Sequence, residues 1–186
     1  MASLQTPVCD FGWKAPGFNL PGVDGNNWTL DNIKGSKGTL VIFICNHCPY
    51  VKSIRQKLVA DLRELKAYGI NTIAIMSNDP VDYPEDSFEN MKALAAELDF
   101  PFPYVQDESQ NVARRYGAIC TPDFFGFDAD LKLQYRGRFD ASGRQAADTS
   151  SRDLFHAMKL IAETGHGPEE QTPSIGCSIK WREQSL

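Results

Sequence analysis

A continuous apolar run from Leu40 to Ile44 is followed at once by Cys45-Asn46-His47-Cys48 and then by Pro49. From Val51 to Leu65, apolar residues recur at spacings of three and four, which is typical of a helix with one apolar stripe. A second apolar run covers Ile70 to Met76, so the pattern predicts a β-α-β unit. Strands that are apolar throughout are typical of sheets covered on both faces by helices. The chain is therefore expected to adopt an α/β fold.

The two cysteines of this segment, Cys45 and Cys48, stand where the predicted strand meets the predicted helix. Two intervening residues wrap about one helical turn, which brings both sulfurs within disulfide-bonding reach. A helix N-terminus carries partial positive charge and unpaired N–H groups, and both stabilise a thiolate, the reactive form of cysteine. The position therefore favours dithiol–disulfide chemistry. Two buried structural cysteines or half of a zinc site are the alternatives, although the chain has no second close cysteine pair.

The residues between and after the cysteines are expected to tune this pair. His47, as an imidazolium, would lower the pKa of a neighbouring thiol; an exposed loop histidine with little influence is the alternative. Asn46 is expected to cap the helix, its side-chain oxygen accepting an N–H from the first turn. Pro49 falls within that first turn, where its missing N–H has no consequence.

The remaining pattern adds elements on either side of the β-α-β unit. No repeat, low-complexity tract or linker interrupts it, so residues 1–186 are expected to form a single domain with a core at 13–164 and a C-terminal tail at 165–186. The predicted elements are an N-terminal hairpin (15–20 and 27–30), an inserted helix (91–98), a short helix (110–116), a second hairpin (123–127 and 131–135) and a last helix (152–164).

Charge and composition exclude several classes of partner. The net charge is −5, from 19 basic and 24 acidic residues, and no basic stripe is present, so no nucleic-acid partner is expected. No apolar stretch approaches the roughly 20 residues of a membrane span, so no membrane association is expected. The opening residues lack the apolar core of a signal peptide, which favours a cytoplasmic protein. In a reducing cytoplasm, the five cysteines are not expected to form structural disulfides.

Four local runs resemble a known bacterial family: Phe43–Val51, Ser77–Pro80, Cys120–Phe124 and Ser174–Trp181. These runs are similar to those of peroxiredoxin-like (AhpC/TSA-like) proteins of the thioredoxin fold, and the resemblance extends from about Trp13 to Trp181. It implies a thioredoxin-like fold, in which a central mixed β-sheet is flanked by helices and joined by the N-terminal hairpin, the inserted helix and the C-terminal tail.

The resemblance also implies an activity, that of a thiol–disulfide oxidoreductase in redox homeostasis that needs no cofactor. Cys45 would be the exposed attacking nucleophile and Cys48 the resolving cysteine. Thr121-Pro122 matches the position of a cis proline that faces the C-x-x-C segment, where the Thr121 backbone would pair with a substrate segment as an extra strand. The implied partners are thiols and disulfides of proteins or small molecules, together with a thiol electron donor.

Three further sets of residues are candidates for a role in the site or in the fold. Cys120 and Cys177 would form an auxiliary thiol pair if the tail folds back over the site; otherwise they are small buried residues. Asp86, with its acidic neighbours, is expected to be a charge at the start of a helix. Arg136, which follows the second hairpin, is expected to be solvated; an active-site arginine is the alternative.

The chain departs from the residue patterns of both thioredoxins and peroxiredoxins, which keeps two other functions open. Thr39 stands where thioredoxins carry a buried aspartate that accepts a proton. Cys45 stands where peroxiredoxins carry a threonine, although Cys48-Pro49 keeps their Cys-Pro pair. A thiol-dependent peroxidase acting on peroxides, with Cys48 attacked and Cys45 resolving, is therefore one alternative. A non-catalytic metal-binding or redox-sensing module using Cys45, His47 and Cys48 is the other.

Overall fold

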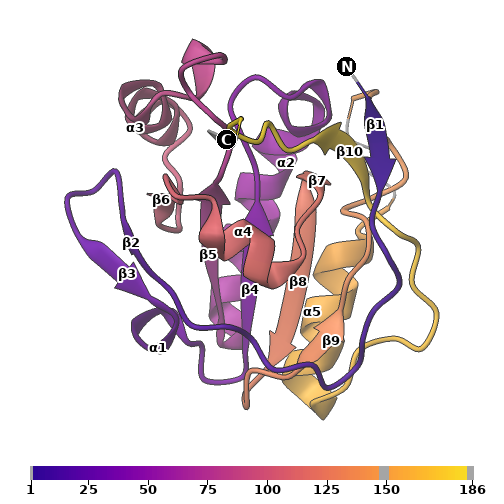
Figure 1. Ribbon diagram of the computed structural model, residues 1–186. Coiled ribbons are helices and arrows are strands. Elements are labelled where there is room, and N and C mark those ends of the chain that lie inside the picture. The colour runs from indigo at the N-terminus through magenta and orange to yellow at the C-terminus, as the bar shows by residue number, and fades with distance from the viewer. Residues whose placement is uncertain (1, 147–150, 184–186) are drawn as a thin grey trace.

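The computed structural model describes residues 2–146 and 151–183 (Figure 1). Its central sheet has the strand order β6-β5-β4-β8-β9. Strands β4, β5 and β6 are parallel, whereas β8 and β9 are antiparallel to their neighbours, so the expected mixed sheet is confirmed. The strands are β4 (Gly38–Phe43), β5 (Ile70–Met76), β6 (Tyr104–Gln106), β8 (Asp123–Asp128) and β9 (Leu133–Tyr135).

Helices cover both faces of this sheet, as the apolar runs predict. Alternate residues of a strand face opposite sides, and on β4 Leu40 and Ile42 belong to one apolar cluster while Val41 and Phe43 belong to the other. The first cluster is completed by the long helices α2 (Pro49–Leu65) and α5 (Asp153–Thr164). The second is completed by the short helices α1 (Leu30–Ile33) and α4 (Asn111–Tyr116), and Figure 1 shows α4 crossing the face opposite α2 and α5.

The N-terminal hairpin is present, with shorter strands than expected. Its strands β2 (Asn19–Pro21) and β3 (Asn27–Thr29) pair antiparallel. The predicted second strand is wrong at Leu30, which begins α1. The Thr29 hydroxyl accepts the Asn32 N–H (3.1 Å), and the Asn32 side-chain oxygen accepts the Thr29 N–H (2.8 Å). This capping box turns the chain from strand to helix.

The segment between β5 and β8 contains the inserted helix α3 (Phe88–Glu97), which begins three residues earlier than expected because Ser87 caps it. A single-turn 3₁₀ helix, η2 (Pro84–Asp86), precedes α3. Another, η1 (Lys66–Tyr68), follows α2 and precedes β5. Strand β6 was not predicted, because Pro101 and Pro103 indicate a break in the chain there.

A small second sheet joins the two ends of the chain beside the start of α2. It has the order β1-β10-β7 and is antiparallel throughout. Its strands are β1 (Ser3–Gln5), β7 (Cys120–Thr121) and β10 (Ile175–Ser178). In Figure 1, β10 crosses the upper end of β7 and lies next to the N-terminal strand. The tail expected after residue 165 therefore contains a strand that packs against the start of α2 and the cis-proline loop.

Among the described residues, no helix combines the length and the apolar character needed to cross a membrane.

Candidate active site

The segment Cys45–Cys48 connects the end of β4 to the start of α2. Cys48 is the residue at the helix N-cap, and its carbonyl accepts the N–H groups of Val51 (3.0 Å) and Lys52 (2.9 Å). Pro49 occupies the first helical position, as predicted. The fold thus places the second cysteine, rather than the first, directly at the positive end of the helix.

Asn46 does not cap α2, so that prediction is wrong. The helix N-cap is Cys48, and no side chain caps it. The Asn46 side-chain amide instead donates to the Glu85 carbonyl (2.9 Å), and its oxygen accepts the Tyr104 hydroxyl (2.9 Å). Asn46 therefore ties the cysteine loop to η2 and β6.

Both cysteines of the pair are free thiols and both are buried: Cys45 is 1% exposed and Cys48 is 0% exposed. The expectation that Cys45 is an exposed attacker is therefore wrong for this conformation. The two thiols meet the same residue, since the Thr121 hydroxyl lies 3.5 Å from the Cys45 sulfur and the Thr121 carbonyl oxygen 3.1 Å from the Cys48 sulfur, and each thiol shifts the pKa of the other.

The surroundings of the two sulfurs favour ionisation of Cys48. A hydrogen bond from the Cys45 thiol lowers the pKa of Cys48; burial opposes this, and further hydrogen bonds from Cys177, Thr121 and the Val51 N–H lower it again. The Thr121 carbonyl oxygen, 3.1 Å from the Cys48 sulfur, suits a protonated thiol instead. Several donors together with the helix N-terminus outweigh this one acceptor, so the pKa of Cys48 lies below its ordinary value.

Cys45 experiences the opposite influences. Its hydrogen bond to Cys48, its burial and the negative charge of Asp86 all raise the pKa of Cys45, and a hydrogen bond from Thr121 only partly offsets them. The Thr121 hydroxyl oxygen is 3.5 Å from the Cys45 sulfur. These directions favour Cys48 over Cys45 as the ionised thiol of the reduced pair, whereas the family resemblance implies that Cys45 is the nucleophile.

Asp86 is a site residue that the sequence analysis missed. It lies in η2, just before α3, but it is 0% exposed and faces the cysteine loop, a role that the expected helix-start charge does not include. Its oxygens accept the backbone N–H groups of Asn46 (2.7 Å) and His47 (3.2 Å) and the side-chain amide of Asn78 (3.0 Å). Burial alone would raise the pKa of Asp86, but hydrogen bonds from His47, Asn78 and Asn46 lower it overall. A buried carboxylate thus fixes the backbone of the cysteine loop.

One signal in the sequence pointed to Asp86. Residues 77–86 follow β5, the parallel neighbour of β4. The carboxyl ends of neighbouring parallel strands open onto the same edge of a sheet, so side chains in the loops after them converge there. Thr39, at the usual place of the thioredoxin aspartate, is buried and accepts the Gly35 N–H (3.0 Å). Asp86 brings a carboxylate to the site from a different element.

His47 is held by Asp86 and is not aimed at a cysteine. Its Nδ1 lies 2.5 Å from an Asp86 carboxylate oxygen and 3.8 Å from the Cys45 sulfur. The ring stacks on Tyr83, with 5.0 Å between centroids and 14° between planes. Its Nε2 is buried without a hydrogen-bond partner among the described residues. The carboxylate nearest the thiols raises the pKa of Cys45, which opposes the lowering expected from His47.

The Thr121-Pro122 peptide bond is cis, as predicted, and Thr121 faces both cysteines. The edge of β7 is not open, however. Cys177 of β10 pairs with Thr121, and Ser178 pairs with Cys120. The place expected for a substrate strand is therefore taken by the chain's own tail.

The two remaining candidate cysteines differ in their surroundings. Cys177 belongs to the same apolar cluster as Cys45 and Cys48, and it shifts the pKa of Cys48. Cys120 is fully buried, and its sulfur is 3.7 Å from the Pro122 carbonyl oxygen. Burial raises the pKa of both thiols, that of Cys177 to about 12. The tail thus brings Cys177, but not Cys120, into contact with the pair.

Arg136 is buried rather than solvated, which corrects another expectation. Its guanidinium donates to both carboxylate oxygens of Asp123, at 3.3 and 2.9 Å. Asp123 directly follows Pro122, so this buried ion pair fixes the start of β8 behind the cis-proline loop.

One cluster within the described residues could supply metal ligands. Cys45, His47 and Asp86 each place one ligand atom within 4.8 Å of the others. Two ligands of one tetrahedral zinc ion lie about 3.3 Å apart, given metal–ligand distances of about 2.0–2.2 Å. The 2.5 Å separation of His47 and Asp86 is shorter than this and is that of a hydrogen bond. The spacing of His47 and Asp86 therefore fits a hydrogen bond between them better than a shared metal ion.

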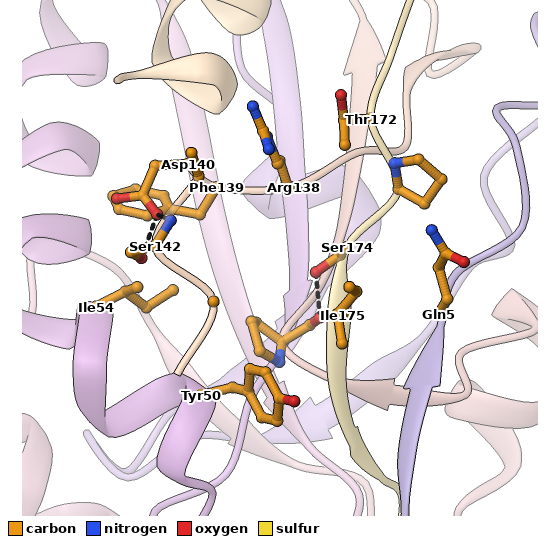
Figure 2. A pocket seen from close by; sticks show the side chains of 14 residues that line it. Gln5, Tyr50, Ile54, Arg138, Phe139, Asp140, Ser142, Thr172, Ser174 and Ile175 are labelled. Atoms are coloured by element: carbon orange, nitrogen blue, oxygen red, sulfur yellow. Dashed lines mark hydrogen bonds between the residues drawn. The ribbon is translucent and has the colours of Figure 1, made fainter. Parts of the chain in front are cut away.

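A cavity of about 140 Å³ lies beside the cis proline. Figure 2 shows Tyr50 and Ile54 of α2 on one side and Ser174 and Ile175 of the tail on the other, with Gln5 of β1 beyond them. The Ser174 hydroxyl donates to the Pro122 carbonyl (2.9 Å), which fixes the tail at the cavity floor. No cysteine lines this cavity, so it does not open onto the thiols.

Comparisons with solved structures agree with this architecture. An uncharacterized conserved protein from Geobacillus kaustophilus is 44% identical over 100% of this chain and 99% of its own, with a TM-score of 0.93. A hypothetical protein from Sinorhizobium meliloti 1021 is 39% identical over 97% and 99%, with a TM-score of 0.91. The thioredoxin domain of a thiol-disulfide oxidoreductase from Bacteroides vulgatus shares the fold at 20% identity, over 68% and 86%, with a TM-score of 0.57.

Curated proteins give no match to this chain. The AhpC/TSA family matches residues 11–136, which include β4, the cysteine pair, α2 and the cis-proline loop. The fold is thioredoxin-like, and the chain belongs to the AhpC/TSA family.

Proposed function

We propose that this protein is a thiol–disulfide oxidoreductase in which Cys45 and Cys48 cycle between a dithiol and a disulfide. The observation that carries the proposal is the placement of two free thiols at the N-terminus of α2, both in contact with Thr121 of the cis-proline loop. Membership of the AhpC/TSA family and the thioredoxin-like fold support a thiol-based redox role.

In the reduced state, Cys48 is the attacking sulfur. Its thiolate displaces one sulfur of a substrate disulfide and forms a mixed disulfide, and the Cys45 thiol then attacks Cys48 to release the second substrate thiol. One substrate disulfide is reduced and the Cys45–Cys48 disulfide forms, so two electrons pass to the substrate. This order reverses the one implied by the resemblance, because the helix N-terminus and most of the donors act on Cys48.

The substrate thiolate that leaves in the resolving step takes up the proton that Cys45 must lose. Because Asp86 raises the pKa of Cys45, that thiol needs a base to resolve the mixed disulfide. The Nδ1 atom of His47 lies 3.8 Å from the Cys45 sulfur, but it is hydrogen-bonded to the Asp86 carboxylate and is not free to accept this proton. Asp86 holds the ring in place beside the Cys45 sulfur.

The partners and location follow from this chemistry. A thiol donor regenerates the dithiol, and the substrates are disulfides of proteins or small molecules, with no bound cofactor in the cycle. A cytoplasmic location suits the proposal, since a reducing environment keeps the resting pair as thiols.

An activity assay tests the proposal. Wild-type protein should catalyse reduction of a protein disulfide by a small thiol, and both Cys48→Ser and Cys45→Ser should lose this catalysis. Cys9→Ser, a cysteine remote from the pair, is the matched control and should retain it. Equal activity of the wild-type and Cys48→Ser proteins would refute the proposal.

A thiol-dependent peroxidase is a second candidate. It is favoured by the lowered pKa of Cys48 and by the AhpC/TSA match. Peroxide would oxidise the Cys48 thiolate to a sulfenic acid with loss of water or alcohol, and Cys45 would condense with it to a disulfide. Stopped-flow mixing with hydrogen peroxide distinguishes the two candidates. Oxidation of Cys48 no faster than that of a free thiol removes the peroxidase.

A further inference from the structure

The C-terminal strand β10 lies where a thioredoxin-like protein would receive a substrate strand. Gly176 approaches the Thr121-Pro122 backbone so closely that a Cβ atom there would lie 2.1 Å from the Thr121 carbonyl oxygen. On either side of it, Ser174 donates to the Pro122 carbonyl (2.9 Å) and the Ile179 N–H donates to Ile119 (3.1 Å). The strand is therefore fitted to the cis-proline loop over its whole length.

Within this strand, Cys177 takes the position of a substrate thiol. Paired residues of a β-ladder project to the same face, so Cys177 projects with its partner Thr121, whose hydroxyl contacts the Cys45 sulfur (3.5 Å). The Thr121 carbonyl is 3.1 Å from the Cys48 sulfur, and Cys177 and Cys48 are close enough for each to shift the pKa of the other. Three cysteines thus meet in one buried cluster.

We propose that Cys177 is a third redox cysteine, which exchanges with the Cys45–Cys48 disulfide inside the same molecule. The inference rests on the proposed function, because that function supplies the Cys45–Cys48 disulfide. In the exchange, the Cys177 sulfur attacks Cys48, the bond between Cys45 and Cys48 breaks, and a Cys48–Cys177 bond forms. Cys45 leaves as a thiol and takes up the proton that Cys177 has lost, so no external oxidant or reductant is needed.

The neighbouring Cys120 does not share this role. It pairs with Ser178, the next residue along β10, so it projects to the opposite face of the ladder from Thr121 and Cys177. Its sulfur lies near the Pro122 carbonyl oxygen (3.7 Å) and not at the cysteine pair. This difference makes the inference specific to one thiol.

The exchange also accounts for the burial of the site. With β10 in place, Cys45 is 1% exposed and Cys48 is 0% exposed, so no protein disulfide reaches either sulfur. A substrate segment must displace β10 from β7, and the tail returns when the substrate leaves. The Cys48–Cys177 bond is then the form in which the closed molecule stores its oxidising equivalents.

Disulfide mapping by mass spectrometry tests the inference in the full-length protein. Cys45→Ser protein is mixed with oxidised glutathione, which forms a mixed disulfide at Cys48. The Cys177 thiol should displace the glutathione, leaving a Cys48–Cys177 disulfide and one released glutathione per chain. A Cys48–glutathione adduct that persists, with Cys177 still free to alkylation after unfolding, would overturn the inference.

The Gly176→Ala variant tests the role of strand placement without touching a sulfur. In the Cys45→Ser background it should push β10 away from Thr121, so the Cys48–Cys177 disulfide should be lost and the glutathione adduct should accumulate. Ile175→Ala, at a 47% exposed position of the same strand, is the matched control and should preserve the disulfide. Equal disulfide yields in the Gly176→Ala and Ile175→Ala proteins would argue against an exchange guided by β10.

The proposed function is measured separately, in the Cys177→Ser variant. A Cys45–Cys48 disulfide in that variant, together with no Cys48–Cys177 disulfide in the Cys45→Ser protein, rejects the third cysteine and keeps the oxidoreductase. Absence of the Cys45–Cys48 disulfide in Cys177→Ser rejects the oxidoreductase itself.

Discussion

At the scale of single residues, the two cysteines differ mainly in which charges and donors surround them. Cys48 receives hydrogen bonds at a helix N-terminus, whereas Cys45 lies beside a buried carboxylate. The assignment of Cys48 as the attacking thiolate depends on position along the chain. Helix α2 begins after the second cysteine, so the helix N-terminus stabilises the thiolate of that cysteine.

Thiolate ultraviolet absorbance followed against pH tests this assignment and does not require access to the thiol. Cys45→Ser retains a hydroxyl donor beside Cys48, so its Cys48 should ionise with a midpoint below the ordinary cysteine value of about 8.5. In Cys48→Ser, Cys45 should ionise above that value. The reverse order of the two midpoints would contradict the assignment.

Asp86 gives a prediction for stability against pH. Its pKa is lower in the folded protein than in the unfolded chain, so the native state favours its ionised form. This contribution is complete above the unfolded value of about 3.9 and is lost as pH falls through the folded value. Asp86→Asn should lower the free energy of unfolding at neutral pH by about 2 kcal/mol, and the deficit should shrink in acid.

Urea unfolding of the two proteins at neutral and acidic pH checks this sign. Asp82→Asn, which changes an exposed aspartate in the same loop, is the matched control and should be close to wild type at both pH values. A deficit in Asp86→Asn that grows as pH falls would contradict the account.

At the scale of elements, the junction between β4 and α2 depends on Asn46 as a tether and not as a cap. Asn46 donates to the Glu85 carbonyl and accepts from the Tyr104 hydroxyl. Aspartate is as good a helix cap as asparagine but cannot donate, so of the two side chains only the amide can do both. Asn46→Asp should therefore destabilise the fold by about 1–3 kcal/mol, as Asn46→Ala should, because buried partners lose their hydrogen bonds.

Thermal or urea unfolding of both Asn46 variants measures this effect. Wild-type stability in Asn46→Asp, combined with a loss in Asn46→Ala, would restore the capping role.

The elements also show what the sequence can and cannot predict. Strand β4, helix α2 and strand β5 were predicted because each carries a long run with one clear period. Strands β7 and β10 have two and four residues, too few for a period, and form only because the tail returns to the cis-proline loop. The same limit applies to the residues of the site. The cysteine pair and Pro122 were readable as local motifs, whereas the burial of Asp86 depends on contacts between distant elements.

At the scale of the whole molecule, the site rests on a sheet whose two faces are both covered by apolar side chains. Leu58 on α2 is buried against this sheet, so Leu58→Ala should lower the free energy of unfolding by about 2–5 kcal/mol. Leu160 on α5 is partly exposed, and Leu160→Ala is the matched control, with a smaller effect. Equal losses in the two variants, measured by urea unfolding, would contradict the described packing of α2.

The central claim is that the Cys45 and Cys48 sulfurs form a reversible bond with each other. The most direct test equilibrates the Cys177→Ser protein with glutathione buffers from fully reduced to fully oxidised, alkylates the free thiols after denaturation, and maps the disulfides. The account predicts one intramolecular Cys45–Cys48 disulfide that forms and disappears with a single midpoint. Cys45 and Cys48 that remain free thiols, or carry only glutathione, at every buffer ratio would contradict it.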